Sequence, residues 1–303
     1  MVGDTEQRDE AGSGVEPPVS PRVRRALGIL ERVAPAIGSR WAVELWCTPP
    51  VMESSLRMPP GVSPGEPVEA MWSGHRIAGE SWGAGPTVYL VHGWGGQRAH
   101  LAVFVKPLVA AGHRVIAFDL PSHNESEPGA LAPGRTTIVE CAEAVRAVVQ
   151  EHGPAYAIVG HSLGAKAAAL ATSWGTSVER MVFLAPMASF SLYLDLFTER
   201  HGFGPRIRAG LHRRLDRRIG MPLLDTDIAN VAARLDDPVP LLIVHDPDDP
   251  DSPHAASEEI ADVWPGATLV STRGLGRLAH YRILRHRPAI NAALEFIGGG
   301  SAD

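Results

Sequence analysis

The sequence predicts an α/β fold in which a mostly parallel, doubly wound sheet carries a helical lid insertion. Short apolar runs without polar alternation are typical of strands buried on both faces, and helical segments separate these runs. Residues 187–238 break this alternation, because they contain helical patterns and no convincing strand. In doubly wound folds the segments after the carboxyl ends of the strands build the site, so this insertion is the candidate lid.

Composition and charge restrict the class of protein and its partners. The chain has 303 residues, of which 45% are apolar and 20% charged, as is ordinary for a soluble globular protein. A formal net charge of -6 argues against general nucleic-acid binding, and no apolar run approaches the ~20 residues of a membrane span. Cys47 and Cys141 provide neither a disulfide framework nor a zinc cluster. We therefore expect a cytoplasmic protein with a small-molecule partner, and no membrane or nucleic-acid partner.

The N-terminal part of the chain is expected to lie outside the sheet. Residues 1–20 are rich in Gly, Asp, Glu, Ser and Pro and are predicted to form a disordered tail. Residues 21–67 are predicted to be a helical segment and linker, with Ser20 as the helix cap and Pro21 in the first turn. Apolar residues at steps of three or four indicate one stripe of an amphipathic helix, kinked or split near Pro35. The stripe consists of Val23, Leu27, Leu30, Ala34, Ile37, Trp41 and Leu45.

The predicted sheet domain covers residues 68–303, and its strands and helices alternate as in a parallel sheet with helices on both faces. An antiparallel hairpin within Met71–Trp82 is expected at the edge of the sheet. The predicted strands are Thr87–Val91, Val115–Phe118, Tyr156–Val159, Met181–Leu184, Leu241–Val244 and Thr268–Val270. The predicted helices are 98–111, 136–152, 162–175, 252–264 and 280–297.

The most specific local feature is Gly160-His161-Ser162-Leu163-Gly164, between a predicted buried strand and an alanine-rich helix. On such a tight turn the serine hydroxyl is exposed at the carboxyl edge of the sheet, and the flanking glycines relieve crowding. The N-terminus of the following helix directs backbone N–H groups toward negative charge that develops beside the serine. The pattern predicts Ser162 as a nucleophile; the alternative is a helix N-cap in a noncatalytic protein.

A serine nucleophile requires a base and a carboxylate that orients the base. The strand at 241–244 leads into the acidic segment His245-Asp-Pro-Asp-Asp-Pro-Asp251. The strand at 268–270 leads into Gly274-Leu-Gly-Arg-Leu-Ala-His280. The order Ser162, Asp249, His280 is the chain order of nucleophile, acid and base in this architecture.

These motifs resemble those of the α/β-hydrolase superfamily over residues 68–297. The resemblance rests on Val91-His-Gly-Trp-Gly-Gly96, Phe118-Asp-Leu-Pro121, the serine turn, the acidic loop and the terminal histidine. The N-terminal helix running into Thr48-Pro-Pro50 is similar to that of a poorly characterised bacterial branch of the superfamily. The resemblance implies a serine hydrolase of the esterase or thioesterase type, which needs no metal or organic cofactor.

The resemblance also implies the roles of the site residues. Ser162, Asp249 and His280 would form a catalytic triad, and the backbone N–H groups of Trp94 and Leu163 would form the oxyanion hole. Two other functions remain open for the same residues. One is acyl transfer, cyclisation or lyase chemistry on the same triad, and the other is a catalytically silent protein that binds a ligand.

The acidic loop offers three candidates for the acid. The His-x-x-x-Asp pattern of the family, matched onto His245, selects Asp249, while Asp248 and Asp251 remain alternatives. Asp246 also occupies a place that is often glycine in the family.

The base carries a second departure from the family pattern. The family commonly has its catalytic histidine directly after Gly-x-Gly, whereas Arg277-Leu-Ala279 precedes His280 in this chain. Tyr281-Arg-Ile-Leu284 still matches the usual start of the last helix. His286 is the competing residue, and it is expected within that helix.

Two other interpretations of these segments are rejected. Gly93-Trp-Gly95-Gly-Gln-Arg98 superficially resembles a dinucleotide-binding loop followed by Asp119, but an arginine stands where the third glycine belongs. The histidines and acids of residues 245–254 have neither EF-hand nor zinc spacing, so no metal site is predicted. His92 and His161 are expected to pack and form hydrogen bonds beneath the site.

The insertion contains a cluster of arginines. Arg213, Arg214, Arg217 and Arg218 share one side of a predicted helix. The favoured interpretation is a solvated face balanced by acids such as Asp216. The alternative is a basic lid that attracts an anionic acyl donor, for example a coenzyme-A-linked or carboxylated substrate.

Overall fold

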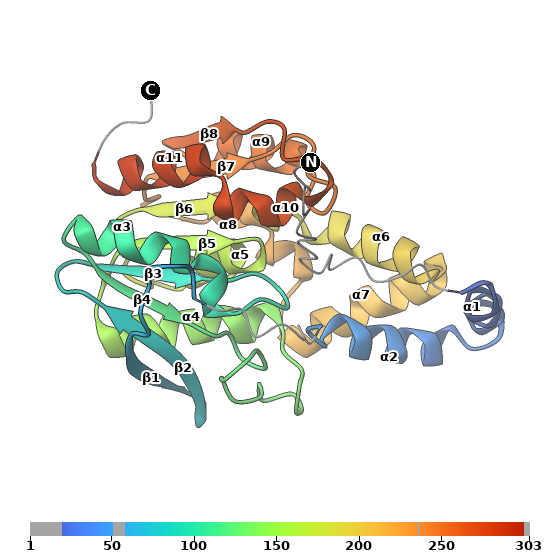
Figure 1. The fold of residues 1–303 in the computed structure, drawn as a ribbon. Helices are drawn as coiled ribbons and strands as arrows, with labels where there is room; N and C mark the ends of the chain where they lie inside the picture. The colour runs from blue at the N-terminus through green and yellow to red at the C-terminus, as the bar shows by residue number, and fades with distance from the viewer. Residues whose placement is uncertain (1–19, 51–57, 236, 300–303) are drawn as a thin grey trace, which may run out of the picture.

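An eight-stranded sheet forms the centre of the protein, with the strand order β1-β2-β4-β3-β5-β6-β7-β8. The computed structural model describes residues 20–50, 58–235 and 237–299, so the predicted disordered tail lies outside the described residues except for Ser20. The β1–β2 and β2–β4 pairs are antiparallel and all other pairs are parallel. Helices cover both faces of the sheet (Figure 1), which confirms the predicted fold class. No helix within the described ranges is long and apolar enough to cross a membrane.

Each strand predicted from an apolar run is present, with ends that differ by at most two residues. The hairpin is longer than predicted, because its first strand begins at Glu66, inside the predicted linker. Pro67 is compatible with this position, since an edge strand tolerates the missing N–H of proline. The strands are β1 (Glu66–Trp72), β2 (His75–Trp82), β3 (Thr87–Val91), β4 (Arg114–Phe118), β5 (Ala155–His161), β6 (Met181–Leu184), β7 (Leu241–His245) and β8 (Ala267–Ser271).

The helices differ from the prediction in two places. The segment predicted as one helix over 98–111 begins as a 3₁₀-helix, and the segment 280–297 is interrupted at His286. Pro288 explains the interruption, because proline has no N–H to continue a helix and is favoured in a first turn. The 3₁₀-helices are η1 (Arg98–Phe104), η3 (Gly276–Leu278) and η4 (Ile283–Arg285). The α-helices are α3 (Val105–Ala110), α4 (Ile138–His152), α5 (Leu163–Ser173), α9 (His254–Val263), α10 (Ala279–Arg282) and α11 (Arg287–Ile297).

The sheet separates two hydrophobic cores. Successive residues of a strand point to opposite faces, so Tyr89 and Val91 belong to one core while Val88 and Leu90 belong to the other. The first core includes α4, α5 and α9, and the second includes η1, α3 and α11. Burial on both faces explains why these strands consist of uninterrupted apolar residues.

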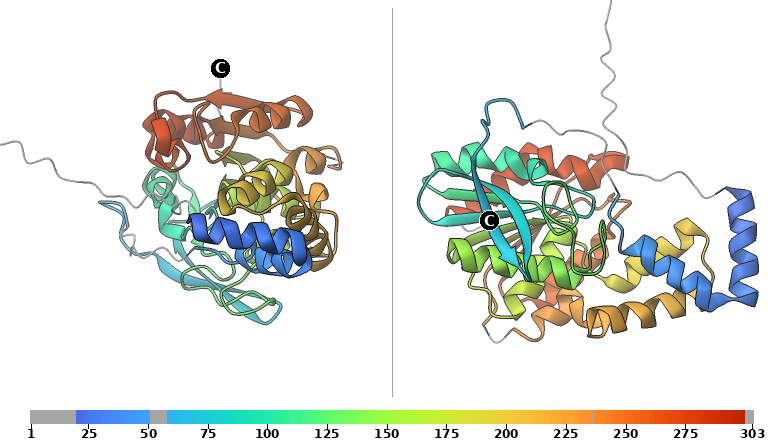
Figure 2. Two further views of the ribbon diagram at one scale, coloured as in Figure 1. Left: turned by 90° about the vertical axis from the view of Figure 1, so that its right-hand side faces the viewer. Right: turned by 90° about the horizontal axis from the view of Figure 1, so that it is seen from below.

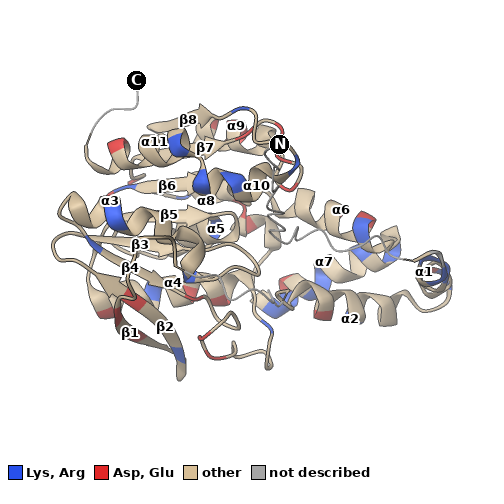
Figure 3. Cartoon of the chain, viewed as in Figure 1, with Lys and Arg blue, Asp and Glu red and all other residues tan. Residues whose placement is uncertain are grey.

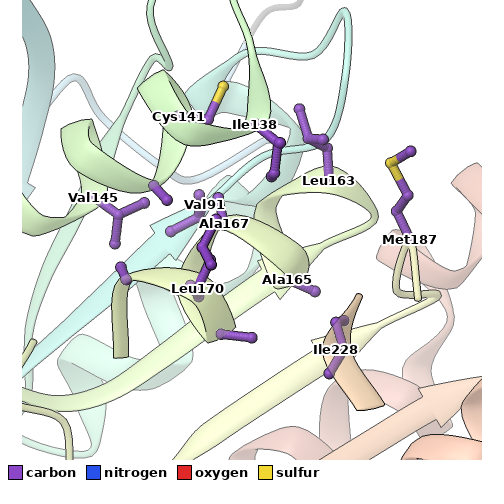
Figure 4. Packing of buried hydrophobic residues seen from close by; sticks show 14 of the residues in the cluster. Val91, Ile138, Cys141, Val145, Leu163, Ala165, Ala167, Leu170, Met187 and Ile228 are labelled. Carbon is purple, nitrogen blue, oxygen red and sulfur yellow. The ribbon is translucent and has the colours of Figure 1, made fainter. Parts of the chain in front are cut away.

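Helix α5, which begins directly after Ser162, is packed on several sides. Its alanines are fully buried, and Figure 4 displays Ala167 on the side of Val145 of α4 and Ala165 on the side of Ile228. Small side chains permit this close approach of α5 to its neighbours. The start of α5 is therefore held firmly by the core.

The predicted insertion consists of α6 (Phe190–His201), α7 (Pro205–Ile219), η2 (Leu223–Thr226) and α8 (Ile228–Ala232), with no strand among its described residues. The N-terminal segment forms α1 (Pro21–Val33) and α2 (Pro35–Trp46), and α2 packs along α7. Helices α1, α2, α6 and α7 extend together beyond one end of the sheet (Figures 1 and 2), whereas α8 packs on α5 and α9. Since α6 follows β6, the insertion leaves the sheet at the carboxyl ends of the strands. Its action as a lid remains a prediction.

The N-terminal helix is split next to Pro35, as predicted, but its apolar stripe is not buried along its whole length. Ala34 has a φ of -149° and a ψ of 56°, which separates α1 from α2 and changes the face that is buried. Ile37 and Trp41 are 62% and 44% exposed. The face of α2 toward α7 instead carries small residues: a Cβ at Gly210 of α7 would lie 2.6 Å from the Ser39 Cβ. The close contact of two helix backbones excludes large side chains there.

The clustered arginines of α7 border α2 as well as solvent, and Arg213, Arg217 and Arg218 are exposed. A hollow of about 300 Å³ between the two helices is lined by Arg214, Arg217 and Arg218, together with Arg40 and Glu44 of α2. Figure 3 displays the blue arginines of α7 beside α2. Glu44, which lies 3.6 Å from Arg218, is the acid of this cluster.

Two further observations concern the predicted charge balance. Desolvation and the positive charges of Arg40, Arg217 and Arg213 lower the pKa of Arg214. Asp216 instead accepts a hydrogen bond from the backbone of Leu223 (2.8 Å). Whether this basic surface attracts an anionic acyl donor remains a prediction.

A buried ion pair connects the insertion to α5. Lys166 is fully buried, and its Nζ lies 2.7 Å from the Asp227 carboxylate just before α8. The same carboxylate oxygen accepts the backbone N–H of Phe190, the first residue of α6, at 2.6 Å. Burial lowers the pKa of Lys166, and Asp227 counteracts that effect. The pair therefore holds the beginnings of α6 and α8 against the helix that carries the nucleophile turn.

We expect Asp227→Asn to lower the free energy of unfolding by about 3–5 kcal/mol, because it leaves the buried Lys166 charge without a counter-charge. Adding Lys166→Met should restore most of the loss, since the pair is then replaced by uncharged groups. Urea denaturation measures both effects. Asp225→Asn, which removes an exposed ion pair with Arg234, is the control and should change stability by less than ~1 kcal/mol. Equal effects of Asp227→Asn and Asp225→Asn would contradict this role of the buried pair.

Candidate active site

Ser162 occupies a strained turn between β5 and α5. Its φ of 51° and ψ of -116° are uncommon for a residue with a side chain, and such strain costs about 1–3 kcal/mol. Its N–H donates to the Leu184 carbonyl at 3.1 Å. A Cβ at Gly160 would lie 2.6 Å from the backbone of α5, and one at Gly164 would lie 2.3 Å from the Val91 carbonyl oxygen. The turn therefore requires both glycines that the sequence places around the serine.

The structure brings together the three side chains predicted as the triad. His280 Nε2 lies 3.0 Å from Ser162 Oγ, and His280 Nδ1 lies 2.8 Å from Asp249 Oδ2. The three residues are only 5–7% exposed. Because the carboxylate accepts the Nδ1 proton of the imidazole, Nε2 is the nitrogen available to accept the serine proton.

Four groups surround the carboxylate of Asp249. Its Oδ2 also contacts His245 Nε2 at 3.2 Å, and its Oδ1 accepts the backbone N–H groups of Asp251 (2.8 Å) and Ser252 (3.1 Å). Burial by itself raises the pKa of Asp249, but the hydrogen bonds from His245 and His280 outweigh burial and lower that pKa below its ordinary value. Asp249 is therefore charged at neutral pH.

The other candidate acids lie outside this chain of contacts. Asp248 is exposed and donates its backbone N–H to the Asp246 carboxylate at 2.9 Å. Asp251 lies 3.6 Å from Arg200, an arginine of the insertion. Among the described acids, Asp249 is the one whose carboxylate contacts His280.

The residues that separate His280 from the Gly-x-Gly of the sequence form η3, so His280 enters the site at the start of α10. His161 lies beneath it, with Nε2 2.8 Å from the His280 carbonyl oxygen and ring centroids 4.8 Å apart. This hydrogen bond fits the expected packing role of His161. His286, the competing histidine, lies between η4 and α11 and is absent from the contacts of Ser162.

The loop after β3 lies against the nucleophile. A Cβ at Gly93 would approach the Ser162 Cβ to 3.0 Å, so only glycine fits between the loop and the serine. Trp94 follows directly, and no described acceptor binds its backbone N–H. Leu163 is the first residue of α5, so its N–H has no acceptor within the helix. The two amides predicted for the oxyanion hole are therefore both close to Ser162. Leu163 follows it in the chain, and Trp94 follows Gly93, which lies against it in space.

Two buried histidines hold this loop. His92 Nε2 accepts the Leu120 N–H at 2.9 Å, and His123 Nε2 accepts the Gly95 N–H at 3.1 Å. An imidazole nitrogen that accepts a hydrogen bond carries no proton, so both rings are neutral. Burial lowers the pKa of His92 well below its ordinary value and lowers that of His123 to about 4.

The segment that superficially resembles a dinucleotide loop is closed by ion pairs. The Arg98 guanidinium contacts Asp119, Glu80 (3.0 Å) and Glu125 (2.8 Å), and the Arg98 backbone N–H donates to Asp119 at 2.8 Å. Asp119, at the end of β4, is fully buried and occupied by these donors. Within the described ranges, no three His, Cys, Asp or Glu side chains are grouped in a way that could hold a metal.

Sequence reasoning missed two groups of the site. In the sequence, His245 served only as the reference position from which Asp249 was selected. In the structure, its imidazole contacts the Asp249 carboxylate. Tyr193, in the first turn of α6, has a buried hydroxyl near Ser162 and Ser252. No signal in the sequence distinguishes this tyrosine, because its position depends on how the insertion folds back.

Known proteins share this architecture. The sequence pattern of the alpha/beta hydrolase family matches residues 88–293. An esterase from Exiguobacterium antarcticum has a TM-score of 0.58 at 17% identity, covering 77% of this chain and 99% of that protein. A hydrolase from Pseudomonas aeruginosa PA01 also has a TM-score of 0.58, at 21% identity, covering 78% of this chain and 99% of its own.

A curated relative is similar over a shorter segment. The dihydrolipoyllysine-residue acetyltransferase component of the acetoin cleaving system of Pseudomonas putida is 38% identical over 109 residues, which are 36% of this chain and 28% of that protein. The chain thus spans less than a third of the length of this relative. The match of the family pattern to more than half of the chain shows that the protein belongs to the alpha/beta hydrolase family, and the solved structures share its fold.

Proposed function

We propose that the protein is a serine hydrolase that cleaves a carboxylic ester or thioester of a small molecule through an acyl-enzyme on Ser162. The observation that carries this proposal is the continuous chain of contacts from Ser162 Oγ through His280 to Asp249. The similarity to esterases and other hydrolases supports hydrolysis in general, and the serine chemistry is inferred from this geometry.

In the first half of the reaction, His280 Nε2 takes the proton of Ser162 as the hydroxyl oxygen attacks the carbonyl carbon. Asp249 holds the imidazole in the tautomer that leaves Nε2 free and stabilises the imidazolium. Collapse of the tetrahedral intermediate breaks the bond to the leaving group, which receives the proton from His280. The Trp94 and Leu163 amides stabilise the negative oxygen.

In the second half, water replaces the leaving group. His280 takes a proton from water as its oxygen attacks the acyl carbon, and Ser162 is released with that proton. Every proton transfer thus uses one nitrogen of one histidine.

Acyl transfer is the second candidate function. The acetyltransferase component of Pseudomonas putida is similar over its matched segment, and an acyl-enzyme can react with an acceptor other than water. Product analysis with and without added alcohol, amine or thiol acceptors separates the two functions. Transfer that exceeds hydrolysis at millimolar acceptor would favour the transferase.

Ser162→Ala should lower kcat for p-nitrophenyl acyl esters by roughly 10⁴-fold or more, since no nucleophile remains. The variant should also fail to react with a fluorophosphonate probe. Ser173→Ala is the matched control, because Ser173 lies at the other end of α5 and donates to the Leu170 carbonyl. Undiminished turnover in Ser162→Ala would refute the serine mechanism, and a wild-type protein that the probe does not label would point to a silent ligand-binding protein.

Asp249→Asn should lower kcat by roughly 10³–10⁴-fold, because an amide can hold His280 in the wrong tautomer and cannot stabilise the imidazolium. Steady-state kinetics on the same ester measures the loss. Asp248→Asn changes an exposed carboxylate outside the contacts of His280 and should leave kcat within about twofold. The assignment of the acid would be wrong if Asp248→Asn were the more damaging variant.

Acid should destabilise the fold through the buried histidines. His123 has a folded-state pKa of about 4 against an ordinary value of 6.5, so the unfolded chain binds more protons between these values. Stability therefore falls as the pH drops from about 6.5 to 4, by up to roughly 3 kcal/mol from His123 alone. Urea denaturation at several pH values measures this slope. His123→Gln should make the slope shallower and His75→Gln should not; identical slopes for all three proteins would exclude His123 as a source.

A further inference from the structure

The hydroxyl of Tyr193 is buried beside Ser252 and Ser162 and makes no hydrogen bond of good geometry with either. The residue is half-buried, but its hydroxyl oxygen is fully buried and has no hydrogen-bond partner among the described residues. Buried tyrosine hydroxyls ordinarily have a partner, since an unpaired one loses its hydration without compensation. An unpaired donor inside a reactive site indicates that a bound molecule supplies the acceptor.

The groups around this hydroxyl belong to the proposed site. Burial raises the pKa of Tyr193, the charges of Asp249 and Asp251 raise it further, and the neighbouring hydroxyls of Ser252 and Ser162 oppose this effect. The phenol therefore keeps its proton. Ser252 donates its own proton to the Pro186 carbonyl at 2.7 Å, and Ser162 faces His280.

The position of Tyr193 is fixed by contacts outside the site. The Asp227 carboxylate accepts the N–H of Phe190 at the start of α6. The Trp46 ring packs on Phe190 and Phe197, with ring centroids 4.9 and 5.0 Å apart. The phenol is thus a preorganised donor on a packed helix.

The strand order places this donor opposite the oxyanion amides. β3, which precedes Trp94, flanks β5 on one side, whereas β6, which precedes Tyr193, flanks β5 on the other. When the carbonyl oxygen of a substrate points to the Trp94 amide, the other substituents of the tetrahedral carbon point away from the β3 loop. The leaving-group atom must also be near His280 Nε2, which gives it a proton. Asp249, behind that imidazole, follows β7, which lies on the same side of β5 as β6.

We propose that Tyr193 is a further catalytic residue, whose hydroxyl donates a hydrogen bond to the leaving-group oxygen of an alkyl ester. The inference rests on the proposed serine mechanism. As the C–O bond breaks, its electron pair goes to the leaving oxygen, and the proton comes from His280 while Tyr193 keeps its own. The hydrogen bond strengthens as negative charge grows on that oxygen, which accelerates the step.

This role predicts the class of substrate. An alkoxide is a poor leaving group and a strong acceptor, so it gains most from the phenol. A thiolate leaves more easily, and sulfur is a weak acceptor of hydrogen bonds. The site is therefore suited to oxygen esters of alkyl alcohols more than to thioesters.

The test compares Tyr193→Phe with the wild type on esters that share one acyl group and differ in the leaving group. We expect kcat/KM to fall about 10- to 100-fold for ethyl and 2-hydroxyethyl esters and less than about threefold for the p-nitrophenyl ester and the thioester. Tyr156→Phe removes another tyrosine hydroxyl, one that donates to the Ile297 carbonyl far from Ser162, and should leave the ratios unchanged.

The outcomes separate this inference from the proposed function. Fluorophosphonate labelling of Ser162 needs no alkoxide departure, so Tyr193→Phe should react at close to the wild-type rate. An equal loss for all leaving groups would reduce Tyr193 to a structural residue, and no loss for the alkyl esters would overturn the inference. So would a wild-type protein that reacts with the probe but hydrolyses no alkyl ester. A wild-type protein that does not react with the probe would instead refute the serine mechanism itself.

Discussion

The ion pair between Lys166 and Asp227 is the interaction on which the arrangement of the site depends. A fully buried lysine is stable as a cation only beside a counter-charge, so the chain before α8 must fold back onto α5. The same carboxylate binds the first N–H of α6. As a result, the insertion is joined to the helix that begins one residue after Ser162, and Tyr193 is held three residues after that junction.

Two neutral histidines hold the start of the β3 loop, whereas the ion pairs of Arg98 hold its far end. His92 and His123 each use one imidazole nitrogen to accept a backbone N–H of the segments around the β3 loop. A charged carboxylate in their place would repel the negative oxygen of the tetrahedral intermediate. A neutral ring positions the loop without that repulsion. The negative charge of Asp249 is kept behind His280, where it stabilises the imidazolium.

The features that could be predicted from the sequence are those fixed by local pattern. Strands such as β3 and β6 are buried on both faces and leave uninterrupted apolar runs, and the serine turn leaves its glycines. Features that depend on distant partners leave no such pattern. Lys166 is one polar residue in an alanine-rich helix, and its burial depends on Asp227, which lies 61 residues away. The break at Ala34, in contrast, could be predicted from the proline that follows it.

The energetics of the site bear on whether the protein is an enzyme or a silent binding protein. Ser162 keeps a left-handed backbone conformation, and the Tyr193 hydroxyl is buried without a partner; each lowers stability by about 1–3 kcal/mol. A binding protein gains nothing from the strained serine, because relaxation of the turn would leave the pocket walls in place. Catalysis does gain from both features. The strained turn holds the Ser162 hydroxyl next to His280, and the Tyr193 hydroxyl can donate to the negative charge that develops on a reacting substrate. Features that cost stability and assist only the transition state favour an active hydrolase.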